Sequence, residues 1–204
     1  YFGLLELSFI DSYKKSSSRQ YISNNLVIKL GSVLLLLLIV IYSVRWIFSE
    51  HNYHLANKYG KDEKFDIAIN AGVKAVKFNP LNARNYIATG NNYLKSKDSL
   101  NAIKQFNQAV ELMPFNVLTL LNLASAYKMS NNVQMEYKIL NTTLSIDPKN
   151  VIASTRLVRF FTERKHYKEA TIVFRRLKDN FEYLKGRSGS GPYHDMVAQV
   201  AIFV

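Results

Sequence analysis

The longest feature of the hydrophobic pattern is an apolar segment from Leu26 to Phe48, LVIKLGSVLLLLLIVIYSVRWIF. A bilayer core about 30 Å thick needs about 20 helical residues to cross it, and this segment is long enough. Its two charges, Lys29 and Arg45, lie near its ends, where long side chains can reach the headgroups. Tyr42 and Trp46 suit an interfacial aromatic belt. The pattern predicts a transmembrane helix over 26–48, with the lipid bilayer as a partner.

Two other interpretations of this segment are less consistent with its residues. A signal peptide would have a shorter apolar core that lies closer to a true N-terminus, and no cleavage site of small residues follows Trp46-Ile47-Phe48. A buried core helix is not expected, because Leu34 to Val40 is apolar on every face. We therefore expect a membrane span.

The first 25 residues leave two interpretations open. Residues 1–10, YFGLLELSFI, are apolar except for Glu6, and residues 11–25 are mostly polar. In one interpretation, 1–10 is the end of a preceding transmembrane helix and 11–25 is a polar loop that joins two spans into a hairpin. In the other, 1–25 is a disordered or interfacial tail. Because the chain begins without Met and stops inside an apolar run, we expect it to be a piece of a longer protein.

Beyond the apolar segment, proline punctuates the chain at a constant spacing of 34 residues, at Pro80, Pro114 and Pro148. Each proline closes a run with helical periodicity, namely AVKFNP, AVELMP and TLSIDP. Proline ends a helix because it lacks an N–H and restricts the residue before it. The spacing therefore predicts a repeated unit of two helices.

Small and bulky residues recur within this period. In the unit 83–116 they occupy the signature positions of the tetratricopeptide-repeat (TPR) family: Tyr86, Gly90, Tyr93, Ala102, Phe106, Ala109 and Pro114. The chain therefore resembles TPR proteins over 49–184. The neighbouring units are looser: Gly72 replaces a bulky residue, Glu136 and Thr143 stand where alanine is usual, and the last unit lacks the proline.

The resemblance implies an all-α fold, a right-handed TPR solenoid of about four helix pairs that follows the transmembrane helix. Units of this kind stack because none can bury its apolar face alone. The helices are expected to start near His51, Asp66, Ala83, Ser99, Val117, Val133, Val151 and Lys168. Residues 185–204 contain GRSGSGP, a flexible Gly/Ser linker, followed by the start of a further helix at Tyr193.

Candidate chemistry is sparse. With no cysteine, disulfides and thiolate metal sites are excluded. His51 and His54 are three residues apart without a third ligand, and His194-Asp195 stands alone, so we expect no metal, cofactor-binding or catalytic residues. The net charge is +12, and basic residues are densest over 156–187. This charge could attract an acidic partner or reflect an ordinary lysine-rich surface. Nucleic acid is not expected, because no groove-reading or stacking motif accompanies the charge.

In a TPR solenoid the first helix of each pair lines a concave groove. The residues expected to face this partner-binding groove are Arg84, Ile87, Asn91, Lys95, Leu121, Asn122, Lys128, Arg156 and Arg159. Some TPR proteins hold the acidic end of a peptide in a carboxylate clamp. Asn91, Asn122 and Arg156 match three clamp positions, while the two lysine positions hold Ile87 and Ile152. We expect a protein or an extended peptide as ligand, with the basic residues favouring an acidic one, or else a solvated groove without a dedicated ligand.

Two functions fit these features. The first is a membrane-anchored scaffold that mediates protein–protein interaction in a cell-envelope complex. The second is the C-terminal, non-catalytic TPR region of a membrane glycosyltransferase, because the architecture also resembles the end of O-antigen ligase or polymerase-type proteins. Their catalytic residues would lie upstream of this chain, which leaves open whether the parent protein is an enzyme. Basic residues precede the span, so the positive-inside rule puts the repeats on the extracytoplasmic side, in the bacterial inner membrane.

Overall fold

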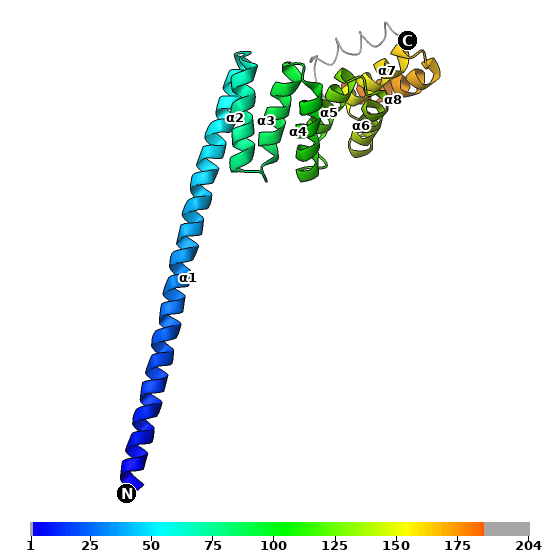
Figure 1. Cartoon of the computed structure of the whole chain (residues 1–204). Coiled ribbons are helices and arrows are strands. Elements are labelled where there is room, and N and C mark those ends of the chain that lie inside the picture. The colour runs from blue at the N-terminus through cyan, green and yellow to red at the C-terminus, as the bar shows by residue number, and fades with distance from the viewer. Residues whose placement is uncertain (1, 186–204) are drawn as a thin grey trace. The chain divides into compact units, whose positions relative to one another are not determined.

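The computed structural model describes residues 2–185, and the side chains of 27–177. Within this part every regular element is a helix and no strand occurs. The helices are α1 (Phe2–Lys61), α2 (Phe65–Phe78), α3 (Ala83–Lys95), α4 (Ser99–Leu112), α5 (Val117–Met129), α6 (Val133–Ile146), α7 (Val151–Glu163) and α8 (Tyr167–Lys185) (Figure 1). The prediction of an all-α fold is confirmed. The linker and further helix expected over 185–204 lie outside the described residues, apart from Lys185.

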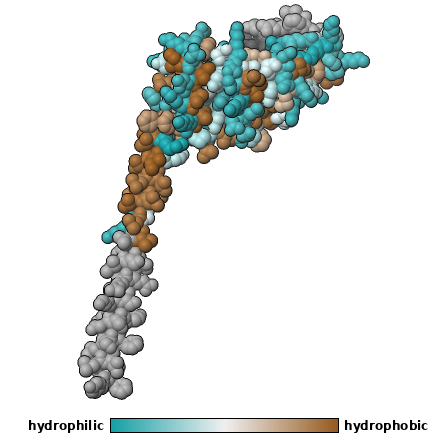
Figure 2. Space-filling model, in the orientation of Figure 1, coloured by the Kyte–Doolittle hydropathy of each residue, from teal (hydrophilic) through white to brown (hydrophobic). Residues whose placement is uncertain are grey.

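The chain divides between Phe48 and Ser49 into two compact units. In the first unit, the side chains from Val27 to Phe48 are all exposed, and Figure 2 shows them as a hydrophobic surface. Among the described residues, one helical stretch, Val27–Lys61, is long and apolar enough to cross a membrane, and none of its most apolar part is buried. By length and composition, an apolar N-terminal helix is therefore present.

Residues 11–25 correct the sequence analysis, which allowed a polar loop there. They are helical and lie inside α1, which runs without interruption from Phe2 to Lys61. The physical reason is the absence of a helix-ending residue: neither glycine nor proline occurs between Leu4 and Leu30. Polarity alone does not end a helix.

The second unit is a stack of helix pairs. Each helix from α2 to α8 packs against the next one in sequence, and α3 also contacts α5. Helices α3 to α7 begin at the residues predicted from the repeat, and α2 and α8 each begin one residue earlier. His51 lies within α1 instead of at a helix start. The stacked solenoid predicted from the 34-residue period is thus confirmed.

Asparagine and aspartate side chains cap the repeated helices. Asn82, Asn116 and Asn150, in the turns between pairs, accept hydrogen bonds from backbone N–H groups of the next helix. Within pairs, Asp98 and Asn132 do the same for α4 and α6. Such caps satisfy N–H groups that have no partner inside the helix. Each turn within a pair contains one residue in the left-handed conformation, namely Glu63, Lys97, Asn131 and Lys165.

The centre of the core depends on one glycine. Phe106 of α4 is completely buried, and a Cβ atom at Gly90 of α3 would lie 2.8 Å from the Phe106 ring. Only glycine therefore lets α3 and α4 approach this closely. The ring belongs to a cluster of buried residues from α4 and α5, Ala102, Phe106, Leu123, Ala126 and Tyr127. The small positions of the repeat pattern thus set the spacing between helices.

Buried asparagines of α3 join the first two helix pairs. The Asn85 amide nitrogen donates to Ser49 Oγ at 2.9 Å and to the carbonyl oxygen of Ala75 at 3.1 Å. The Asn92 amide nitrogen donates to the carbonyl oxygen of Ala56 at 3.1 Å. These bonds satisfy polar groups inside the stack. They also hold the segment that begins at Ser49 firmly against α3.

Candidate functional site

The first helices of the pairs, α3, α5 and α7, form what we call the first-helix face. A hollow of about 220 Å³ opens on this face between α5 and α7. Lys128, Arg156 and Arg159 bring three positive charges to its wall, and Glu136 and Leu140 of α6 complete the lining with Ala124 and Ser125. Three of the nine residues predicted to face the groove therefore meet at one place.

Arg156 spans the two helices that border the hollow. Its Nη1 donates to the carbonyl oxygen of Leu121 at 2.6 Å and to Ser125 Oγ at 2.8 Å, and its side chain is half-buried. Burial lowers the pKa of Arg156, and the nearby charge of Arg159 lowers it further. Two neutral acceptors hold the guanidinium in place but do not cancel its charge. Arg156 therefore contributes an ordered positive charge to the hollow.

The other two cations differ in how they are engaged. Lys128 Nζ lies 3.0 Å from Glu163 Oε1, and both side chains are about half exposed, so this ion pair is weak and easily opened. Arg159 is exposed, and no ion pair joins its guanidinium to any residue that the structure describes. Of the three cations that line the hollow, Arg156 is held in place by hydrogen bonds, and Lys128 can readily leave its ion pair. Arg159 has no ion-pair partner among the described residues.

Glu136 lines the same hollow as these cations, and it was not identified as a site residue from the sequence. Its side chain is 7% exposed, and Arg164 Nη2 lies 3.9 Å from its Oε2. Burial raises the pKa of the Glu136 carboxyl, although the charges of Lys128 and Arg164 act in the opposite direction. A signal was present in the sequence, since this glutamate stands where the repeat normally has alanine. The negative charge of ionised Glu136 offsets part of the positive charge that Lys128, Arg156 and Arg159 bring to the hollow.

We expect the free energy of unfolding of the Glu136→Gln variant to increase relative to that of wild type as pH rises. With a folded pKa above the unfolded one, wild type holds its proton longer when folded, so its stability falls from about pH 4 until the carboxyl is ionised. Glutamine lacks this titration. Urea unfolding of both proteins across that range measures the difference. A difference that stays constant or shrinks with rising pH would contradict the assigned direction of the shift.

Asn91 and Asn122, predicted to face the groove, are bonded to each other. The Asn122 amide nitrogen donates to Asn91 Oδ1 at 3.0 Å across α3 and α5, and both side chains are half-buried. The Asn91 amide nitrogen and the Asn122 amide oxygen retain their capacity for hydrogen bonding. Ile87, one turn earlier on α3, is also half-buried. This part of the first-helix face is uncharged and combines two amide side chains with one apolar residue.

Two further predicted groove residues lie against the first helix pair, away from the hollow. Arg84 pairs with Glu50, 3.4 Å between Nη2 and Oε2, and its guanidinium lies 5.3 Å from the centre of the Tyr53 ring. Lys95 Nζ donates to the carbonyl oxygen of Gly60 at 3.3 Å. These cations therefore link α3 to the end of α1.

Leu121 corrects the groove prediction. It is 3% exposed and packs in a cluster with Ala124, Leu140, Ala153, Leu157 and Phe160. The reason is geometric: consecutive residues on a helix point about 100° apart, so Asn122 lies half-buried beside Asn91 while Leu121 turns into the core. Only the Leu121 carbonyl takes part in the site, as an acceptor for Arg156.

Two histidines, His54 and His166, each lie near one carboxylate. His54 Nε2 lies 3.2 Å from Glu50 Oε1, and His166 Nδ1 lies 3.7 Å from Glu169 Oε1. Glu50 is partly buried, and the other three side chains are exposed. No group of three or more potential ligands gathers within the side chains that the structure describes. Zinc sites usually have at least three protein ligands, and each of these pairs offers two.

The stacked pairs, the proline-marked turns and the close glycine contact define the TPR fold. Solved structures with this fold are similar to the chain. MamA from residue 41 to its end, from Desulfovibrio magneticus RS-1, gives a TM-score of 0.62 at 16% identity over 66% of this chain and 76% of that one. The OM64 TPR domain from Arabidopsis gives 0.54 at 21% identity over 57% and 96%.

A third similar structure is the second TPR domain of human RPAP3 in complex with the HSP70 peptide SGPTIEEVD. It gives a TM-score of 0.52 at 20% identity over 58% of this chain and 97% of that one. No family model and no curated protein sequence matches the chain. The similarity to solved structures therefore establishes the fold alone.

Proposed function

We propose that the protein is a membrane-anchored scaffold whose first-helix face binds an extended, acidic segment of another protein within a cell-envelope complex. The observation that carries the proposal is the hollow lined by Lys128, Arg156 and Arg159. Arg156 is held in position, and Arg159 is exposed without an ion-pair partner among the described residues. Ordered cations on a concave surface favour carboxylates.

The neutral part of the face suits the backbone of such a ligand. Asn91 and Asn122 lie on the neighbouring helices α3 and α5, where amide groups can bond to the main chain of an extended peptide. Ile87 and Ile152 replace the two lysines of the carboxylate clamp. We therefore place the acidic side chains of the ligand at the hollow and assign no clamp for a terminal carboxylate.

The anchor in this proposal is the segment 26–48. Its side chains from Val27 to Phe48 are exposed. An apolar surface of this size is unfavourable in water. A bilayer would cover it. With the basic residues Lys14, Lys15 and Arg19 on the cytoplasmic side, the repeats would face the extracytoplasmic side of a bacterial inner membrane.

The alternative, an O-antigen ligase-like membrane enzyme, has less support. That resemblance depended on a terminal hairpin of two spans before the repeats, with a loop at 11–25. The loop residues are helical and continue α1. The cations of the hollow also suit the binding of an acidic protein segment, which is what a scaffold does.

Arg159→Glu is expected to weaken binding of a labelled glutamate-rich peptide at least about tenfold, which corresponds to about 1.4 kcal/mol. The substitution replaces attraction by repulsion at an exposed position, so the fold should be retained. Fluorescence anisotropy with the full chain in detergent measures the affinity. Binding should also weaken with added salt, because exposed charges are screened.

Lys104→Glu is the matched control, because Lys104 is exposed on α4, a second helix, and the change in net charge is identical. Peptide affinity should be unchanged in this variant. Equal losses in both variants would show that the peptide responds only to net charge. If wild type fails to prefer the glutamate-rich peptide over a lysine-rich one, the acidic ligand is wrong.

A further inference from the structure

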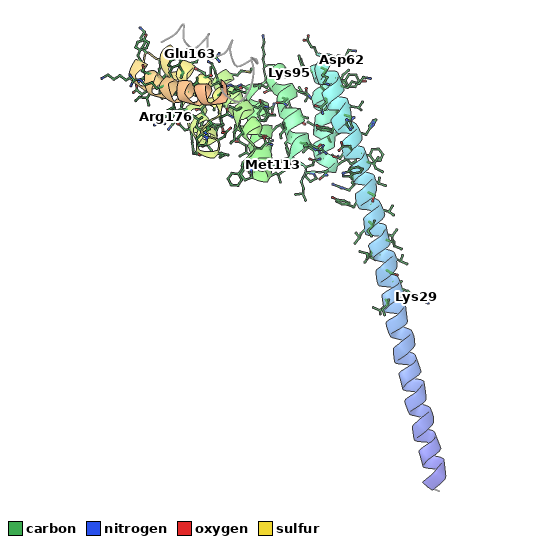
Figure 3. The ribbon with its side chains drawn as sticks, turned by 180° about the vertical axis from the view of Figure 1, so that it is seen from behind. Lys29, Asp62, Lys95, Met113, Glu163 and Arg176 are labelled. Atoms are coloured by element: carbon green, nitrogen blue, oxygen red, sulfur yellow. The ribbon has the colours of Figure 1, made fainter. Side chains whose placement is uncertain are left out.

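The turns that connect one helix pair to the next lie along one edge of the solenoid, which we call the inter-pair edge. It comprises the turns 79–82, 113–116 and 147–150. Figure 3 shows Met113 at this edge, while Asp62, Lys95 and Glu163 lie at the opposite one. The two edges are separated by the length of a helix, which for α4 is about 20 Å at 1.5 Å per residue.

Apolar side chains project from the first two of these turns. Leu81 is 80% exposed and Phe115 is 77% exposed, at equivalent positions of the repeat. Leu118, in the first turn of α5, and Met113 are exposed beside Phe115. In Figure 2, brown surface lies along this edge, whereas the opposite edge is mainly teal. The turns within pairs, by contrast, consist entirely of polar and charged residues.

Hydrogen bonds tie this edge to the residue that follows the proposed span. Ser49 Oγ donates to the carbonyl oxygen of Ala75 at 3.1 Å and accepts from the Asn85 amide nitrogen at 2.9 Å. The same amide nitrogen donates to the carbonyl oxygen of Asn79, the first residue of the Leu81 turn. Ser49 is thus bonded to both sides of that turn. When 26–48 crosses a bilayer, the Leu81 turn must lie close to the membrane surface.

We infer that the inter-pair edge rests in the interfacial layer of the same bilayer, with Leu81, Phe115 and Leu118 among the lipid headgroups. The inference rests on the proposed membrane anchor. Exposed apolar side chains next to a membrane gain free energy by leaving water, and interfacial elements sink about 5–10 Å into the headgroup boundary. In the third turn, Lys149 takes the position of Leu81 and Phe115. A lysine there can reach anionic headgroups.

Exposure alone does not select this edge, because Leu100 is 75% exposed at the opposite end of α4. What distinguishes the inter-pair edge is that hydrogen bonds connect it to Ser49, the residue that follows the proposed span. The arrangement also leaves the hollow accessible, since Lys128 and Glu163 lie near the ends of α5 and α7 that are remote from the inter-pair edge. A scaffold docked in this way would keep its ligand site away from the lipid.

Single-cysteine variants can test the inference, because the natural chain contains no cysteine. Leu81→Cys and Phe115→Cys place a fluorophore on the inter-pair edge, and Leu100→Cys is the matched control with similar exposure on the opposite edge. The full chain is reconstituted at low density in phosphatidylcholine–phosphatidylglycerol vesicles. Quenching by spin-labelled lipid is expected to be several-fold stronger at positions 81 and 115 than at position 100.

A fourth variant, Leu36→Cys, reports the span itself, because residue 36 lies at its centre. Strong quenching at position 36 together with equal, weak quenching at 81, 115 and 100 would overturn the docking while leaving the anchor intact. Absence of quenching at position 36 would overturn both. Spectral changes at 81 or 115 that depend on protein density would indicate a second copy at this edge and would also overturn the inference.

Discussion

Phe106→Ala is expected to lower the free energy of unfolding of the solenoid by about 3–5 kcal/mol, the usual cost of truncating a buried phenylalanine. The side chain is completely buried between α3, α4 and α5, and the ring lies against Gly90 and within the cluster that includes Leu123 and Tyr127. Gly90 carries no side chain that could move into the space. The cavity would therefore stay largely open, which places the cost in the upper part of the range.

Urea unfolding of the full chain in mild detergent, followed by far-UV circular dichroism, measures this effect. Phe115→Ala is the matched control, since it removes the same atoms from a side chain that is 77% exposed. In detergent we expect the control to change the unfolding midpoint little, because surface substitutions usually stay within about 0.5 kcal/mol. Similar losses in the two variants would contradict the assignment of Phe106 as a core residue.

The sequence predicts the solenoid well because proline and asparagine act locally. Pro80, Pro114 and Pro148 end helices wherever they occur, and the asparagines two residues later cap the next ones. These effects need no knowledge of distant contacts. Helix starts were therefore correct for α3 to α7. One of the two interpretations of 1–25 made 11–25 a loop because of its polar composition, whereas these residues are helical and none of them is a glycine or proline that would end a helix.

The candidate site was only partly predictable, because each first helix is buried on more than one side. It packs against its own partner and against the second helix of the preceding pair, so only a narrow strip of its surface stays accessible. Asn122 lies on that strip and Leu121 does not, although the two are adjacent. Without the packing, repeat position alone could not separate them. The convergence of Lys128, Arg156 and Arg159 likewise depends on how α5 and α7 are spaced.

Glu136 illustrates a different limit. Its departure from the usual alanine was visible, but a sequence does not show whether such a residue is buried or what surrounds it. The structure places it in the lining of the hollow, with Arg164 3.9 Å away. A buried carboxylate under a basic rim affects both stability and the charge seen by a ligand. An exception to a repeat pattern is therefore a good place to look for a site.

Leu36→Arg combined with Leu38→Arg is expected to abolish stable membrane association of the chain. Each change replaces a residue that favours the centre of the bilayer by one that opposes it, at about 3 kcal/mol per position. Both side chains lie near the middle of 26–48, too far from either end for arginine to reach the headgroups easily. The measurement is the fraction of protein that remains in the membrane pellet after alkaline extraction.

Val27→Arg combined with Ile28→Arg adds the same two charges at the end of the span, beside Lys29. Arginine there can extend into the headgroup layer, so this variant should stay in the pellet. If only the variant with central arginines leaves the membrane pellet, the effect of a charge depends on its depth in the bilayer, as expected for a transmembrane helix. If both variants remain bound, the repeats or the first 25 residues must hold the protein at the membrane without a crossing helix. Loss of both would instead mean that any added charge disrupts a peripheral apolar contact, and 26–48 would lose its role as the anchor.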